Sequence, residues 1–153
     1  MNRVEKAKEN FKKGCNCTQA VVGAYCDLFG MPLETAMIMA EPFGGGLGRM
    51  RMTCGAVSGM SMLAGMKYSS GTKNDMAARK QVYAAVQAMV QAFQEKNGTV
   101  VCAELLGRNL PKDGGAKPTA RTPEFYKKRP CLDCIGDCAI LVEKYLLDGE
   151  QES

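Results

Sequence analysis

The residue type with the greatest chemical potential in this sequence is cysteine. The chain contains eight cysteines and no histidine. Without an imidazole, the sequence excludes serine-histidine-aspartate triads, cysteine-histidine nucleophilic pairs and metal sites with histidine ligands. The chemistry that remains is that of the thiol, which can bind a metal, cycle between thiol and disulfide, or pack as a small apolar side chain. Because eight cysteines are more than packing alone usually requires in a chain of 153 residues, we expect some of them to be functional.

Three of the cysteines are closely spaced near the end of the chain. Cys131, Cys134 and Cys138 are separated by two and then three residues, a spacing that suits thiolate ligation of zinc or of an iron-sulfur cluster. A structural zinc site usually contains two close cysteine pairs, and the only other close pair is Cys15 with Cys17. Zinc bound in the region of Cys131, Cys134 and Cys138, in a non-catalytic binding or interaction module, is therefore the alternative to a redox function.

The apolar pattern predicts helices throughout the chain. Apolar residues recur mostly at three- and four-residue steps, and glycine or proline ends most of the runs. The predicted helices cover residues 3–13, 18–29, 32–40, 54–65, 74–96, 99–106 and about 136–147. No strand-like alternation and no internal repeat is present, and residues 108–130, with four prolines, are typical of a long loop. We therefore expect an all-α fold: a compact bundle of five to seven helices, with one long loop before the last helix, in a single domain over residues 1–153.

Two of the predicted helices have features that bear on packing. The helix at 54–65 contains more glycine than an isolated helix tolerates, at about 1 kcal/mol each relative to alanine, so we expect its small residues to let another backbone approach closely. The helix at 74–96 has the clearest periodicity, and we expect it to form the spine of the bundle. The glycine-rich segment 44–49 has no strand before it and no Gly-Lys-Ser/Thr after it, which favours a tight connection over a phosphate-binding loop.

The predicted helices place sulfur atoms from distant parts of the chain on inward faces. Cys17, Cys102 and Cys138 each lie in an apolar stripe of a different helix. Cys54 lies at the start of a fourth helix, where free backbone N–H groups and the helix dipole are expected to stabilise the thiolate and lower its pKa. If these sulfurs converge, they form either a four-thiolate pocket for a cluster or one or two redox-cycling pairs. The competing interpretation is that each is a buried, unreactive thiol.

One cysteine also belongs to a segment that resembles a known family. The segment is Cys54-Gly55-Ala56-Val57-Ser58-Gly59. It resembles the central block of the redox-active proteins named C_GCAxxG_C_C, and the likeness extends over roughly residues 9–147. The other three family cysteines carry over to Cys17, Cys102 and Cys138. The resemblance implies a compact helical protein of redox function with no defined substrate.

The resemblance also implies a set of site residues. Its four thiols would be the ligands of an iron-sulfur cluster, as in a related domain, or the catalytic thiols of a thiol/disulfide couple: Cys17, Cys54, Cys102 and Cys138. Gly55 and Gly59 of the central block would belong to the cofactor-binding part of the site. Cys131 and Cys134 fall outside the pattern and would form a secondary metal-binding set.

The distribution of charge narrows the expected partners and compartment. The net charge of +4 is spread along the chain, which predicts only weak attraction to nucleic acid. The first ten residues are rich in charge and lead into no apolar run, so we expect neither a secretory signal nor a membrane span, and a cytoplasmic location. The leading hypothesis is a small cytoplasmic redox protein that exchanges electrons with a redox partner protein or a small-molecule electron donor.

Overall fold

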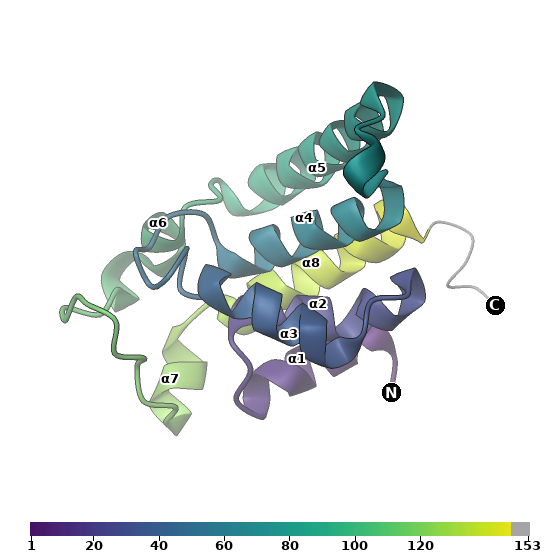
Figure 1. The fold of residues 1–153 in the computed structure, drawn as a ribbon. Coiled ribbons are helices and arrows are strands. Elements are labelled where there is room, and N and C mark those ends of the chain that lie inside the picture. Colours follow the sequence, from purple (N-terminus) through teal and green to yellow (C-terminus); the bar gives the residue numbers. More distant parts are fainter. Residues whose placement is uncertain (148–153) are drawn as a thin grey trace.

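The computed structural model describes residues 1–147, and this part of the chain is built from helices without a named strand (Figure 1). The α-helices are α1 (Arg3–Lys12), α2 (Cys17–Tyr25), α3 (Leu33–Ala40), α4 (Gly55–Tyr68), α5 (Met76–Asn97), α6 (Cys102–Leu106), α7 (Pro123–Lys128) and α8 (Cys131–Leu146). Short 3-10 turns follow several of them. The predicted all-α class is confirmed, and the described residues form eight α-helices, one more than the upper bound of five to seven.

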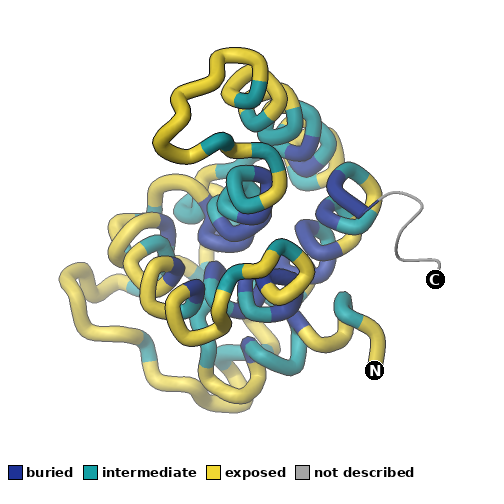
Figure 2. Tube along the Cα trace, turned by 45° about the vertical axis from the view of Figure 1, so that its right-hand side comes forward, coloured by how far each residue is buried: buried dark blue, intermediate teal, exposed yellow. Residues whose placement is uncertain are grey.

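The core lies between α1, α2, α4, α5 and α8. In Figure 1, α4 and α8 run side by side through the middle of the molecule, with α1, α2 and α3 below them and α5 above. Figure 2 shows that the buried residues lie on the facing sides of these helices. The largest fully buried side chains include Tyr25, Phe93, Met60, Leu63, Met89 and Ile135. Helices α2, α4 and α8 thus form the rigid frame on which the remaining elements pack.

The glycines of α4 allow α2 to approach very closely. A β-carbon added at Gly59 would lie 3.1 Å from the carbonyl oxygen of Thr18 and 3.2 Å from the Cβ of Val21. One added at Gly55 would collide with the Cys17 sulfur and lie 2.6 Å from the hydroxyl oxygen of Thr18. That hydroxyl, which is fully buried, donates a 2.8 Å hydrogen bond to the carbonyl of Gly55. The expectation that small residues on this helix admit another backbone is confirmed.

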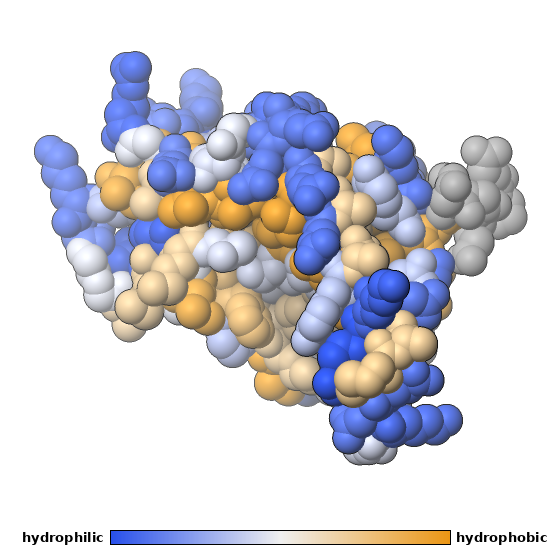
Figure 3. Space-filling view, turned by 90° about the horizontal axis from the view of Figure 1, so that it is seen from above, coloured by the Kyte–Doolittle hydropathy of each residue, from blue (hydrophilic) through white to orange (hydrophobic). Residues whose placement is uncertain are grey.

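Helix α5 was expected to be the spine of the bundle, and this expectation is wrong. Of its side chains, only Met89 and Phe93 are buried, whereas Met76 and Tyr83 are 60% and 61% exposed. Many of its residues are alanine and glutamine, so its periodicity supports a helix that covers the core on one side only. On the face seen from above in Figure 3, hydrophobic surface lies between groups of hydrophilic side chains. None of the helices in residues 1–147 has the length and apolar character needed to cross a membrane.

The long loop contains a helix that the sequence pattern did not reveal. Thr122 caps α7 by accepting a hydrogen bond from the N–H of Phe125, and Pro123 occupies the first turn, where a proline is tolerated. The rings of Phe125 and Tyr126 pack against Phe11 of α1, with centroids 5.9 and 5.8 Å away. These contacts hold the segment before α8 against α1.

Helix α8 begins at Cys131, five residues before the predicted start at residue 136. On one helix, residues three and seven positions apart lie on the same face. The early start therefore places Cys131, Cys134 and Cys138 along one side of α8, which packs against α4.

Candidate functional site

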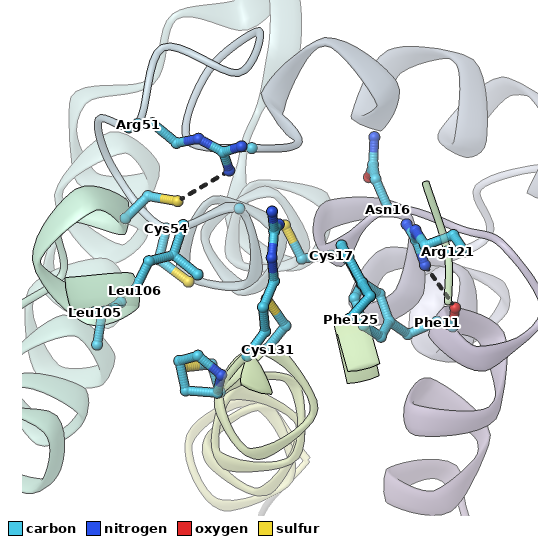
Figure 4. Close-up of a pocket in the computed structure, with 16 residues that line it drawn as sticks. Phe11, Asn16, Cys17, Arg51, Cys54, Leu105, Leu106, Arg121, Phe125 and Cys131 are labelled. Atoms are coloured by element: carbon cyan, nitrogen blue, oxygen red, sulfur yellow. Dashed lines mark hydrogen bonds between the residues drawn. The ribbon is translucent and has the colours of Figure 1, made fainter. Parts of the chain in front are cut away.

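Five cysteines from four helices line one cavity at the end of the bundle where these helices begin. The cavity has a volume of about 80 Å³, and its sulfur-bearing wall consists of Cys17, Cys54, Cys102, Cys131 and Cys134. We call it the thiol pocket. Figure 4 shows Cys17, Cys54 and Cys131 around it, with the labelled arginines Arg51 and Arg121 at its edge. Apolar side chains, among them Leu105 and Leu106, complete the wall.

Each cysteine of the pocket is placed by the start of a helix. Cys17 and Cys131 are the first residues of α2 and α8, and Cys54 immediately precedes α4. The start of α2 is fixed by a capping box, in which Asn16 and Gln19 exchange side-chain and backbone hydrogen bonds. Because the amino-terminal ends of helices carry unpaired N–H groups and partial positive charge, three long helices direct positive potential at the same pocket.

The glycine-rich segment brings further groups to the pocket. It turns through left-handed backbone conformations, with positive φ at five successive residues, 45–49. Several of its N–H groups bond to its own carbonyls, as in the 3.1 Å bond from Arg49 to Gly44, which favours the predicted tight connection over a phosphate loop. Burial raises the pKa of Cys17, and a hydrogen bond from the N–H of Gly45 to its sulfur opposes this shift. The segment therefore closes one side of the thiol pocket.

A short antiparallel contact holds Cys54 beside α6. Thr53 and Val101 form an isolated bridge, and the N–H of Cys54 donates a 2.7 Å hydrogen bond to the carbonyl of Val100. The N–H of Cys102 in turn bonds to the carbonyl of Met52. Two segments almost fifty residues apart are thereby fixed next to one another at the pocket.

The expectation that the helix dipole lowers the pKa of Cys54 is wrong. Hydrogen bonding with the Cys134 thiol, followed by burial, raises the pKa of Cys54 well above its ordinary value. The N–H groups of Ala56 and Val57 act in the expected direction, but their effect is smaller. Cys54 and Cys134 are 7% and 3% exposed, so a thiolate at either position would lose most of its hydration. In the absence of a bound group, the Cys54 thiol is held neutral.

The neighbouring thiols show the same effect of burial. Burial raises the pKa of Cys131 to about 12, and it raises that of Cys138 well above its ordinary value. Burial also raises the pKa of Cys102, although Arg51 opposes this shift. The guanidinium of Arg51 lies 3.8 Å from the Cys102 sulfur and donates a hydrogen bond to it. Only a bound cation or a strong positive field would turn these thiols into thiolates at neutral pH.

The structure brings together three of the four cysteines of the family pattern. Cys17, Cys54 and Cys102 line the thiol pocket, and Gly55 lines it with them. Cys138 lies one helical turn beyond Cys134 on α8, is 0% exposed and is not part of the pocket wall.

The secondary set of the sequence-based prediction lies at the pocket itself, since Cys131 and Cys134 are both in its wall. Gly59 packs against α2 away from it. Arg51 and Arg129 also line the pocket, although the sequence-based prediction did not include them among the site residues. The capping pattern Thr122-Pro123-Glu124 is the signal that could have revealed α7 and the aromatic residues beside it.

The two remaining cysteines lie away from the pocket. Cys26 is buried in a small separate cluster with Val22, Ala36 and Ala40. Cys15 is partly buried, and Arg121 bonds to its backbone carbonyl. All eight cysteines are free thiols. Within residues 1–147, no three cysteine, aspartate or glutamate side chains are arranged as the ligands of a single metal ion would be.

Comparison with known proteins identifies a family across most of the chain. Residues 15–145 match the family described as "Putative redox-active protein (C_GCAxxG_C_C)". The matched segment includes every cysteine of the thiol pocket. No curated protein and no solved structure shows a significant match.

Proposed function

The chain belongs to the C_GCAxxG_C_C family of redox-active proteins, and on that premise we propose that its thiol pocket holds an iron-sulfur cluster for electron transfer. The proposed ligands are Cys17, Cys54, Cys102 and Cys131. The observation that carries the proposal is the convergence of five thiols from the starts of four helices on one cavity. Four thiolates are the usual ligands of such a cluster, and the electropositive starts of α2, α4 and α8 would offset their negative charge.

Hydrogen-bond donors around the pocket are placed to interact with the sulfurs of the proposed cysteine ligands. N–H groups that bond to ligand sulfurs, together with burial, set the potential of iron-sulfur clusters. Gly45 offers such a bond to Cys17, and Arg51 offers one to Cys102. When bound, the cluster would supply one-electron chemistry. The chain itself would hold the sulfurs, limit water through Leu105 and Leu106, and balance charge through Arg51.

Anaerobic purification tests this proposal. The protein is expected to be brown and to contain iron and acid-labile sulfide, and the Cys102→Ala variant should lose at least about 90% of both. Cys26→Ala is the matched control, because Cys26 is buried outside the pocket, and it should retain the full content. Comparing Cys131→Ala with Cys138→Ala identifies the ligand from α8: we expect loss in the first and retention in the second. Colourless, iron-free wild-type protein would contradict the proposal.

One contact favours a second candidate, a dithiol couple. Cys54 and Cys134 both line the thiol pocket, and the interaction between their thiols is the largest cause of the raised pKa of Cys54. Their oxidation would form one S–S bond and release two protons and two electrons to an acceptor. Iron-free protein that loses two of its eight thiols on mild oxidation, with no such loss in Cys134→Ala, would support this couple over the cluster.

Metal analysis of the same samples also tests the zinc module. One zinc per chain whose removal unfolds the protein, with the full zinc content retained in Cys54→Ser, would support a non-catalytic module that uses Cys131, Cys134 and Cys138.

For the redox protein we propose a cytoplasmic location, since free thiols persist in reducing compartments.

A further inference from the structure

A second, larger cleft adjoins the thiol pocket and is lined by four arginines. Its volume is about 330 Å³, at the lower end of the range for small-molecule sites. The two cavities share wall residues, including Arg51, Arg121 and Arg129, and the fourth arginine is Arg49. The only carboxylate side chain in the lining is that of Glu41, which is exposed. We call this the arginine cleft.

Two of these arginines lie over the same aromatic ring. The guanidinium carbons of Arg121 and Arg129 lie 4.8 and 4.3 Å from the centroid of the Phe125 ring. Stacking on an aromatic ring orients a guanidinium without using the N–H donors at its edge. Arg129 donates one hydrogen bond, of 3.2 Å, to the hydroxyl of Thr119. Because a guanidinium carries five N–H donors, most of those of Arg129 remain available to a ligand.

Among the described residues, three of the four arginines of the cleft have no carboxylate partner, the exception being Arg49 with Asp113. Arg49 bonds to Asp113, Gly115 and Thr119 and so ties the long loop to the glycine-rich segment. Within residues 1–147, no carboxylate forms an ion pair with Arg51, Arg121 or Arg129. Arg49 and Arg129 even share the Thr119 hydroxyl, at 2.8 and 3.2 Å. Burial lowers the pKa of Arg129, Cys131 opposes this shift, and Arg51 and Arg49 add to it.

The thiol pocket does not account for all of this charge. Arg51 contacts a sulfur, but the hydrogen bond of Arg129 is made to Thr119, on the loop that borders the cleft. Planar guanidinium groups with free edges bind phosphate, sulfate and carboxylate through paired hydrogen bonds. The adjoining positions of the two cavities would put the remainder of such a molecule next to the thiols.

We propose that the arginine cleft binds the anionic group of a small molecule that gives one electron to the proposed cluster or takes one electron from it. The ligand class is an organic phosphate, sulfate or carboxylate. The electron exchange rests on the proposed redox function, whereas the anion binding does not. Of the two partner types expected from the sequence, the cleft favours the small molecule over a redox protein.

Calorimetric titration of the purified protein with inorganic sulfate at low chloride tests the site. Saturable binding is expected, and Arg129→Gln should weaken it at least about tenfold. Arg79→Gln is the matched control, since Arg79 is exposed on α5, outside the cleft. The sulfate affinity of this variant should equal that of the wild-type protein. Circular dichroism checks the fold, and Arg51→Gln replaces Arg129→Gln if the latter unfolds. Absence of saturable binding, or equal affinity in all variants, would overturn the inference.

A second titration separates a free inorganic anion from the anionic part of a larger molecule. Phenyl phosphate is expected to bind more tightly than inorganic phosphate, because the cleft also presents Phe125 and Pro118. Weaker binding of phenyl phosphate would overturn the assignment to an organic ligand. Sulfate binding in a protein without reversible redox chemistry would refute the proposed function alone. A redox-active protein that binds no anion would refute only the cleft.

Discussion

Gly55→Ala is expected to destabilise the protein by about 3 kcal/mol, as overpacking of a tight interior does. The new methyl group would meet the Cys17 sulfur and the Thr18 hydroxyl, both on α2. Relief requires α2 and α4 to separate, which would also strain the buried hydrogen bond from Thr18 to the Gly55 carbonyl. Denaturant unfolding monitored by circular dichroism measures the change.

The same helix supplies the control for this prediction. Gly65 also lies in α4, but a β-carbon there would have no neighbour within 4 Å. Gly65→Ala should therefore stabilise the protein by about 0.5–1 kcal/mol, through helix propensity alone. Equal effects of the two substitutions would show that the close approach of α2 to Gly55 does not exist in solution.

Alkaline pH is expected to unfold the reduced, metal-free protein. Burial raises the pKa of Cys131 to about 12, from an ordinary value of 9.0. Because the folded state holds this proton more tightly than the unfolded state, the stabilisation is complete below pH 9 and is lost as the pH rises toward 12. The expected loss is about 1.4 kcal/mol per pH unit, or about 4 kcal/mol in total, from this thiol alone. The raised pKa values of Cys54 and Cys138 add to it in the same direction.

Denaturant titrations at pH 7, 9, 10 and 11 measure this dependence. Cys131→Ala removes one of the contributing thiols, so its stability should fall less steeply above pH 9, by about 1.4 kcal/mol per pH unit. Tyr25, whose pKa is also raised by burial, is present in both proteins and cancels in the comparison. Parallel pH profiles for the two proteins would show that Cys131 is not shielded from solvent.

The sequence predicted the helices well where local signals were strong. Asp75 and Gly98 bracket α5 as a capping residue and a left-handed C-terminal glycine, and this helix agrees with the prediction to within about two residues. The close packing of α4 could also be predicted, because glycine within a helix has a cost that only a tight neighbour explains. Both inferences depend on residues near one another in the chain.

The parts that escaped prediction depend on contacts between distant residues. That α5 lies at the periphery follows from how α2 and α8 pack around α4, which periodicity does not encode. The largest cause of the raised pKa of Cys54 is Cys134, eighty residues away. Likewise, Arg129 and Arg49 meet only because the long loop folds back, with Thr119 between them.

Electron uptake by the thiol pocket is the most direct test of the account. Anaerobic redox titration of the purified protein, followed by visible absorption, should show a reversible change of one electron per chain that is absent in Cys102→Ala. A reversible two-electron change without iron would point to Cys54 and Cys134 instead. A wild-type protein that takes up no electrons reversibly would contradict the claim that these converging thiols form a redox site.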